Sequence, residues 1–188
     1  DIFYGDYLDK AELEKLEETT ARPGYTLNGW YTDEFYTEEG RWDFANKKAE
    51  PEDEVLHLYA YWSWDEYTVD FSTWEGDAQV PPAQGIRYGQ TVPRPKPDPV
   101  RTHYTFDNWY ADLNAQEKVP WDFDKNEVTG NMTLYANWTP KTYTLSFETN
   151  GGSALAPVEV TYGEHVSLDT LSTKKTGYNF AGWYKDSA

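Results

Sequence analysis

One pattern occurs three times in this 188-residue sequence. A Trp-Tyr pair stands at residues 30–31, 109–110 and 183–184, so the spacings are 79 and 74 residues. A Tyr-Gly pair comes before each of them in the same way, at residues 4–5, 88–89 and 162–163. Self-similarity at a period of this length is typical of tandem modules. We therefore predict three repeats: the first (1–62) without its opening strand, a complete middle repeat (67–138), and the last (143–188) without its C-terminal part.

The composition favours a folded chain with small cores that are rich in aromatic side chains. Hydrophobic residues make up 38% of the sequence and the mean hydropathy is −0.86, but 18% of the residues are aromatic. Large aromatic side chains bury about 150–250 Å² each, so a few of them suffice for a small core. Disordered chains are poor in such residues, which makes disorder a weak interpretation.

The net charge of −17 is concentrated in the first repeat, where 16 acidic and 6 basic residues give −10. Such a surface repels phosphates and anionic lipid, which argues against nucleic acid or a membrane surface as partner. The charge indicates either solubility with mutual repulsion or attraction for a basic partner. No Cys is present, and no apolar run reaches the roughly 20 residues that a membrane span needs. Because the sequence begins and ends inside a repeat, we expect it to be an excised piece of a longer polypeptide.

Local patterns predict mainly β modules of about four or five short strands, with a helical connector in some copies. Alternation places Tyr67, Val69 and Phe71 on one strand face. In the first repeat, residues 9–18 have the spacing of a capped helix: Asp9 can cap it, with Leu8 and Leu13 spaced as a hydrophobic staple, and Pro23-Gly24 ends it. The middle connector has prolines at alternate positions, which forbid a helix. The last connector allows at most a short helical turn at 167–171.

The combined motif resembles the Listeria–Bacteroides repeat, the B-repeat type of the internalins. It consists of Tyr-Thr-x-x-Phe, Asn-Gly-Gly, Tyr-Gly, Gly-Tyr-x-Phe-x-Gly-Trp-Tyr, Asp-Phe and Leu-Tyr-Ala-x-Trp, and it matches best over 143–184. The middle repeat departs from it at Asn108, which stands for Gly, and at Trp74-Glu75, which replaces Asn-Gly. These departures leave its turn geometry open. The resemblance implies β-grasp-like modules in tandem on bacterial surface proteins, used as spacers or adhesive segments, with no catalytic residues.

No constellation of a catalytic, cofactor-binding or metal site emerges from the sequence. The three histidines, His57, His103 and His165, have no ligand spacing, and surface or packing roles explain them better. Residues 122–126 imitate the start of a calcium loop, but Glu127 occupies the position that requires Gly. We therefore predict no enzyme, no cofactor and no metal.

The tryptophans divide into two groups. Seven of them recur at corresponding positions and are expected to fill or close the modules: Trp30, Trp109 and Trp183; Trp42 and Trp121; Trp62 and Trp138. Trp64 and Trp74 have no counterparts, since Pro140 and Asn150 stand in their places. Exposed rings can bind sugars or anchor a protein. The competing interpretation is that Trp64 packs in the linker between repeats and Trp74 over its own turn.

Two functions follow from these observations. The first is a non-catalytic spacer, stalk or adhesive region on the bacterial cell surface, in a secreted or cell-wall-anchored parent protein; four-residue linkers at 63–66 and 139–142 predict little free tumbling. The second is a module that binds a carbohydrate, a cell-wall component or a basic host protein through Trp64, Trp74 and the acidic face. The incomplete outer repeats also predict open sheet edges, which invite head-to-tail self-association.

Overall fold

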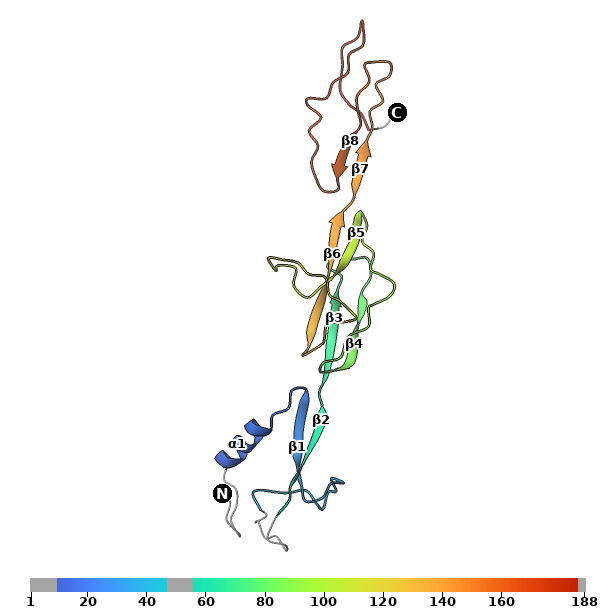
Figure 1. Cartoon of the computed structure of the whole chain (residues 1–188). Coiled ribbons are helices and arrows are strands. Elements are labelled where there is room, and N and C mark those ends of the chain that lie inside the picture. Colours follow the sequence, from blue (N-terminus) through green and yellow to red (C-terminus); the bar gives the residue numbers. More distant parts are fainter. Residues whose placement is uncertain (1–9, 47–55, 186–188) are drawn as a thin grey trace. The chain divides into compact units, whose positions relative to one another are not determined.

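The computed structural model describes residues 10–46 and 56–185 of the chain (Figure 1). The described part contains one helix, α1 (Lys10–Thr20), and is otherwise built from strands. The strands are β1 (Tyr25–Tyr31), β2 (Tyr59–Trp64), β3 (Glu66–Ser72), β4 (Val80–Arg87), β5 (Tyr104–Tyr110), β6 (Met132–Pro140), β7 (Thr142–Leu145) and β8 (Val158–Thr161). The prediction of a mainly β chain is confirmed, whereas the β-grasp assignment stays a prediction.

The helix lies where the first connector predicts it. Its sequence is rich in Ala, Leu, Glu and Lys, which are strong helix formers. Near its end, the Thr20 hydroxyl donates a hydrogen bond to the Leu16 carbonyl at 2.8 Å. Pro23 and Gly24 follow closely and cannot continue it. The predicted cap at Asp9, the residue Leu8 and the opening Tyr-Gly motif at 4–5 lie outside the described residues.

Three sheets account for all eight strands. Strands β1 and β2 pair antiparallel, as do β7 and β8, and the remaining four form a sheet in the order β4-β3-β6-β5. The pairing of β1 with β2 shifts register between Leu27 and Gly29, and that of β5 with β6 shifts between Phe106 and Trp109. The bulge before the Trp-Tyr pair is thus kept although Asn108 replaces Gly. The Asn108 side chain accepts a hydrogen bond from the Trp109 amide at 2.9 Å.

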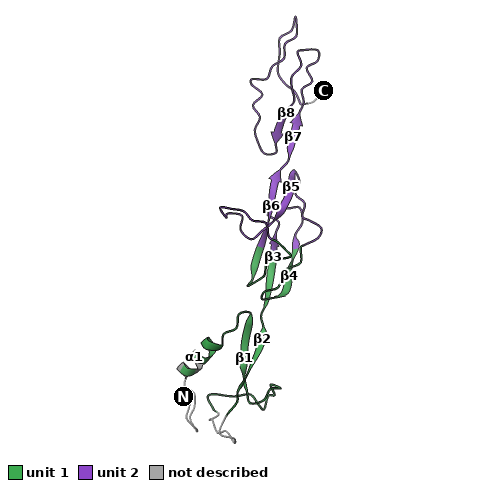
Figure 2. Ribbon diagram, viewed as in Figure 1, with its two compact units in different colours: residues 1–70, 81–94, 122–133 green, residues 71–80, 95–121, 134–188 purple. Residues whose placement is uncertain are grey.

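The chain divides into two compact units, shown in Figure 2. Unit 1 comprises residues 1–70, 81–94 and 122–133; unit 2 comprises residues 71–80, 95–121 and 134–188. The division falls within the middle repeat, so strands β3, β4 and β6 contribute residues to both units.

The buried hydrophobic side chains belong almost entirely to the middle repeat. In unit 1 they are Tyr31, Val69, Val92 and Val128; in unit 2 they are Phe71, Trp109, Tyr110, Leu134 and Ala136. Val69 and Phe71 are buried while Asp70 between them is exposed, as the alternation in this strand predicts. Among the described residues, no helix is both long and apolar enough to cross a bilayer.

Candidate functional site at the joints between repeats

The shared and the unshared tryptophans differ in their exposure. All seven shared rings are buried or half-buried, and Trp109 has no exposed surface. By contrast, Trp64 is 50% exposed and Trp74 is 60% exposed. The recurring rings therefore serve the architecture, as their recurrence indicates. Trp64 belongs to unit 1 and Trp74 to unit 2, and the structure does not assign them a common site.

Trp64 lies at the end of β2, where the first repeat meets the middle one. The guanidinium carbon of Arg87 lies 3.4 Å from the centre of its ring. Such a cation–π contact contributes about 0.5–1 kcal/mol at an exposed position. One face of the ring is thus occupied by a side chain of the next repeat. This contact favours the interpretation that Trp64 packs between repeats, and its role in ligand binding stays a prediction.

The predicted four-residue linkers are largely absorbed into strands. Strand β2 ends at Trp64 and β3 begins at Glu66, so only Asp65 lies between them. In the same way, only Lys141 separates β6 from β7. A connection of one residue leaves the chain few ways to turn between neighbouring repeats.

The first joint, defined by Gly24, Asp65 and Tyr88, lies wholly within unit 1. Gly24 has a φ of 76°, in the region that glycine tolerates best. Its carbonyl accepts a hydrogen bond from the Asp65 amide at 2.8 Å. A Cβ added to Gly24 would lie 2.1 Å from the Cβ of Tyr88, so the backbone of one repeat touches the tyrosine of the next. The contact with Tyr88 requires glycine here, and the conformation favours it.

The second joint, defined by His103, Lys141 and Tyr162, lies wholly within unit 2. His103 has a φ of 67°, and its carbonyl accepts a hydrogen bond from the Lys141 amide at 2.9 Å. Its imidazole stacks on the Tyr162 ring, with centroids 4.3 Å apart and planes 19° apart. The Nδ1 atom lies 3.0 Å from the hydroxyl oxygen of Tyr143. Tyr104 completes the cluster with an edge contact to Tyr162 at 5.6 Å.

The two joints use corresponding positions of the repeat. Gly24 and His103 each precede the first Tyr of the strand that leads to the Trp-Tyr pair, while Tyr88 and Tyr162 each begin a Tyr-Gly pair. The joint is therefore part of the repeated pattern rather than a variable linker. Sequence reasoning treats His103 as a surface or packing residue and gives these tyrosines no role. The recurrence of Tyr-Gly in every copy is the signal that could have identified them.

Trp74 lies on a turn that has the geometry of its Asn-Gly counterpart. Trp74 and Glu75 have φ values of 41° and 63°, and Asn150 and Gly151 have 49° and 82°. A backbone hydrogen bond closes each turn. In the middle repeat the Gly76 amide donates to the Thr73 carbonyl at 3.1 Å, and in the last repeat the Gly152 amide donates to the Thr149 carbonyl at 3.0 Å. The middle repeat thus keeps the turn with residues that are strained in it.

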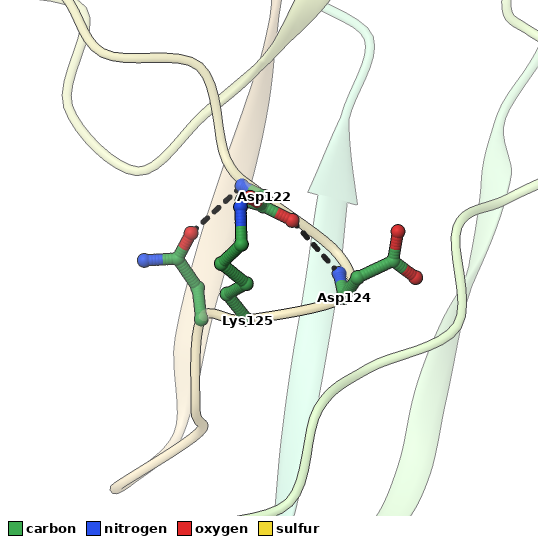
Figure 3. Close-up of polar contacts among 4 residues, drawn as sticks. Asp122, Asp124 and Lys125 are labelled. Atoms are coloured by element: carbon green, nitrogen blue, oxygen red, sulfur yellow. Dashed lines mark hydrogen bonds and ion pairs between the residues drawn. The ribbon is translucent and has the colours of Figure 1, made fainter.

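The loop that imitates a calcium site is organised by protein groups, as Figure 3 shows. The carboxylate of Asp122 accepts a hydrogen bond from the Asp124 amide at 3.0 Å and forms an ion pair with the Lys125 ammonium at 2.8 Å. Asn126 accepts a hydrogen bond from the Asp122 amide at 2.7 Å. The hydrogen bond to Lys125 is the main cause that lowers the pKa of Asp122, and the same contact raises the pKa of Lys125. Within residues 10–46 and 56–185, His and acidic side chains form no group of three suited to a metal.

The model of the Listeria-Bacteroides repeat domain matches the chain at residues 6–60, 67–137 and 143–188. A protein of Evansella cellulosilytica named "Putative membrane protein" is 38% identical over 179 residues, which cover 94% of this chain and 25% of that protein. A second protein of the same organism, named "Putative Gly-rich membrane protein", is 36% identical over 176 residues, which cover 90% of this chain and 19% of that protein.

Internalin H of Listeria monocytogenes is 35% identical over 129 residues, which cover 67% of this chain and 22% of the internalin. The chain thus spans about a quarter or less of the length of these relatives. The family match covers most of the sequence, and it follows the same recurring motifs that fill the middle repeat and form the joints. The chain therefore belongs to the Listeria-Bacteroides repeat family.

Proposed function

We propose that this chain is a non-catalytic spacer segment of a bacterial cell-surface protein, located outside the cell in a secreted or cell-wall-anchored parent. Three β-grasp-like modules, at 1–62, 67–138 and 143–188, would make up the segment. The observation that supports this function is the pair of matched joints. Each joint combines a one-residue connection, a backbone hydrogen bond from the connecting residue to the preceding repeat, and a tyrosine from the next repeat. The relatives, named membrane proteins and an internalin, agree with such a location.

The physical argument concerns the orientation of neighbouring repeats. A flexible linker lets two domains rotate freely, whereas a spacer must transmit a fixed direction from one domain to the next. At the second joint, the Lys141 amide donates to the His103 carbonyl of the middle repeat, and the Tyr162 amide of the last repeat donates to the Lys141 carbonyl at 2.9 Å. The His103 and Tyr162 rings also stack on each other. A change of orientation at Lys141 would disturb the stacked pair and the hydrogen bond of Tyr162 together. The repeats on either side should therefore move as one body.

Distance measurements by pulsed electron paramagnetic resonance test this directly, because the chain has no Cys and spin labels can be placed singly. For the first joint, the labels replace the exposed residues Glu34 and Gln84 as Glu34→Cys and Gln84→Cys, both in unit 1. We expect a narrow distance distribution in the parent chain. Gly24→Ala should broaden it, because the new Cβ meets Tyr88. Gly130→Ala is the matched control, since a Cβ there meets nothing within 4 Å.

The second joint is tested with labels at the exposed residues Thr105 and Glu164, both in unit 2. His103→Ala removes the stacking on Tyr162 and should broaden the distribution. His165→Ala, at an exposed histidine of the last repeat, should leave it unchanged. A broad distribution in the parent chain at both joints would contradict the spacer function.

The exposure of Trp64 and Trp74 supports a second proposal, a module that binds a glycan, a cell-wall component or a host protein. The chain with Trp64→Ala and Trp74→Ala is compared with the parent on arrays of glycans and matrix proteins. Binding by the parent that is lost in the double variant would support this function. Binding that persists in the double variant, or no binding by the parent, would refute it.

A further inference from the structure

Three tyrosines of the first repeat form a cluster that is open to solvent on one side. The rings of Tyr36 and Tyr61 lie 4.8 Å apart at 32°, and both contact Tyr31 edge-on at 5.5 Å and 5.9 Å. Tyr31 is buried at 7% exposure, whereas Tyr36 and Tyr61 are 41% and 38% exposed. Next to Tyr36 in the chain, Phe35 is 80% exposed. We call Tyr31, Phe35, Tyr36 and Tyr61 the tyrosine patch.

The architecture of the repeat does not require these exposed rings. In the middle repeat, Asn114, Ala115 and Asn137 occupy the positions of Phe35, Tyr36 and Tyr61. There the counterpart of Tyr31 is Tyr110, whose hydroxyl donates to Asp107 at 2.7 Å, and Asn137 donates to the same carboxylate at 3.2 Å. The middle repeat thus fills this position with a polar network, and the first repeat fills it with aromatic rings in contact. An aromatic residue that does not recur is free to serve a purpose other than folding.

The loop that carries the patch is fixed in place by Asp33. Its carboxylate accepts hydrogen bonds from the Phe35 amide at 3.0 Å, the Thr37 amide at 3.2 Å and the Thr37 hydroxyl at 2.7 Å. The bond from the Thr37 hydroxyl is the main cause that lowers the pKa of Asp33. Tyr36 has a φ of 55°, a conformation that is uncommon for a bulky residue. The loop therefore presents the patch in one conformation, which reduces the entropic cost of binding.

The charge around the patch selects its partner. Residues 32–43 contain five acidic side chains (Asp33, Glu34, Glu38, Glu39 and Asp43) and one basic side chain, Arg41. The faces of tyrosine rings attract cations, and carboxylates nearby strengthen that preference. Anionic partners would be repelled. A Lys- or Arg-bearing segment combines the charge and the apolar stem that such a surface fits.

We propose that the tyrosine patch is a docking site for a cationic segment, rich in Lys or Arg, of a partner protein. This inference goes beyond the spacer function and does not depend on it, because the patch contains none of the joint residues. The partner's ammonium or guanidinium groups lie over Tyr36 and Tyr61, and its flanking cations face Glu34, Glu38 and Glu39. Phe35 packs against the apolar stems.

The test exchanges the patch for the residues of the middle repeat. Tyr36→Ala and Tyr61→Asn are combined, which leaves the net charge unchanged and uses side chains that the same fold already carries at these positions. Binding of a fluorescent peptide of alternating Lys and Gly is measured by anisotropy at about 0.15 M salt, where long-range attraction is screened. We expect the double variant to bind about tenfold more weakly than the parent. Equal affinity would overturn the proposal, because charge alone would then explain the binding.

Two further variants and a second probe sharpen the result. Glu38→Gln with Glu39→Gln should also weaken binding and reduce its dependence on salt, whereas Trp64→Ala with Trp74→Ala should not change it. Near-ultraviolet circular dichroism and the amide signals of strands β1 and β2 in the first repeat check that each variant is folded. The second probe is a neutral cello-oligosaccharide. If the parent binds it but not the peptide, and the Tyr36→Ala and Tyr61→Asn exchange abolishes that binding, the partner is a glycan and the proposal of a cationic partner is overturned.

Discussion

The middle and last repeats share a strand pattern but differ in what it buries. Val69 and Phe71 of β3 are 0% and 7% exposed. Leu145 and Phe147, at the same positions of the last repeat, are only half-buried. Strand β3 has a neighbour on each side, β4 and β6, whereas β7 pairs only with β8 in the described part of the chain.

The comparison shows that an alternating pattern decides which face of a strand turns inward, but not how completely it is buried. Burial comes from the neighbouring strand β6, which contributes Leu134 and Ala136 to the core of the middle repeat. At about 25 cal/mol per Å² of buried apolar surface, the second neighbour is a large part of the stability of so small a module. The shared aromatic rings are a necessary part of the core but not a sufficient one.

The largest effect is expected from removing the Trp ring in each repeat. Trp109→Ala removes a fully buried ring that contacts Phe71 and Phe106, and it should cost about 3–5 kcal/mol. Trp183→Ala removes a half-buried ring and should cost about 1–2 kcal/mol. Urea unfolding, followed at the amides of the repeat that carries the change, measures both. Equal losses of unfolding free energy in the two variants would contradict the view that the middle repeat has the more completely buried core.

A turn exchange should stabilise the middle repeat by a smaller amount. Trp74→Asn with Glu75→Gly installs the residues of the last repeat at two positions of positive φ, and relief of strain should contribute about 1–2 kcal/mol. The change also removes the ion pair between Glu75 and Arg101, which lowers the gain slightly. A higher urea midpoint for the middle repeat is the expected result. A lower midpoint would show that Trp74 contributes more by packing than it costs in strain.

The smallest effect concerns alkaline pH. The pKa of Tyr110 is raised above its ordinary value of 10.0. The hydrogen bond to Asp107 is the main cause, and burial is the second. A folded state that holds this proton more tightly is stabilised below pH 10.0, and the contribution is lost as the pH rises through the folded pKa. Tyr110→Phe should therefore reduce the decrease in stability above pH 10.0 relative to the parent. An identical decrease in both proteins would contradict the assignment.

Much of the architecture follows from local rules that the sequence displays. Recurrence identifies Trp109 as a core residue, and helix-forming residues with a Pro-Gly stop indicate α1. The joints could not be predicted in this way, because the stacking of His103 on Tyr162 depends on how two repeats meet. The turn at Trp74 could not be predicted either, because Trp74 and Glu75 are poor residues for positive φ, and the pairing of the flanking strands holds them in that conformation. The pairing of Tyr36 with Tyr61 joins a loop to a distant strand, and no local pattern indicates it.

Native-state hydrogen exchange tests the central claim most directly, namely that neighbouring strands rather than the repeated pattern decide how completely each repeat is buried. Amides of β3 and β6 in the middle repeat should exchange on the order of 100-fold more slowly than those of β7 and β8, because opening them requires unfolding of a complete core. Equal protection in the two repeats, or faster exchange in the middle one, would contradict the account.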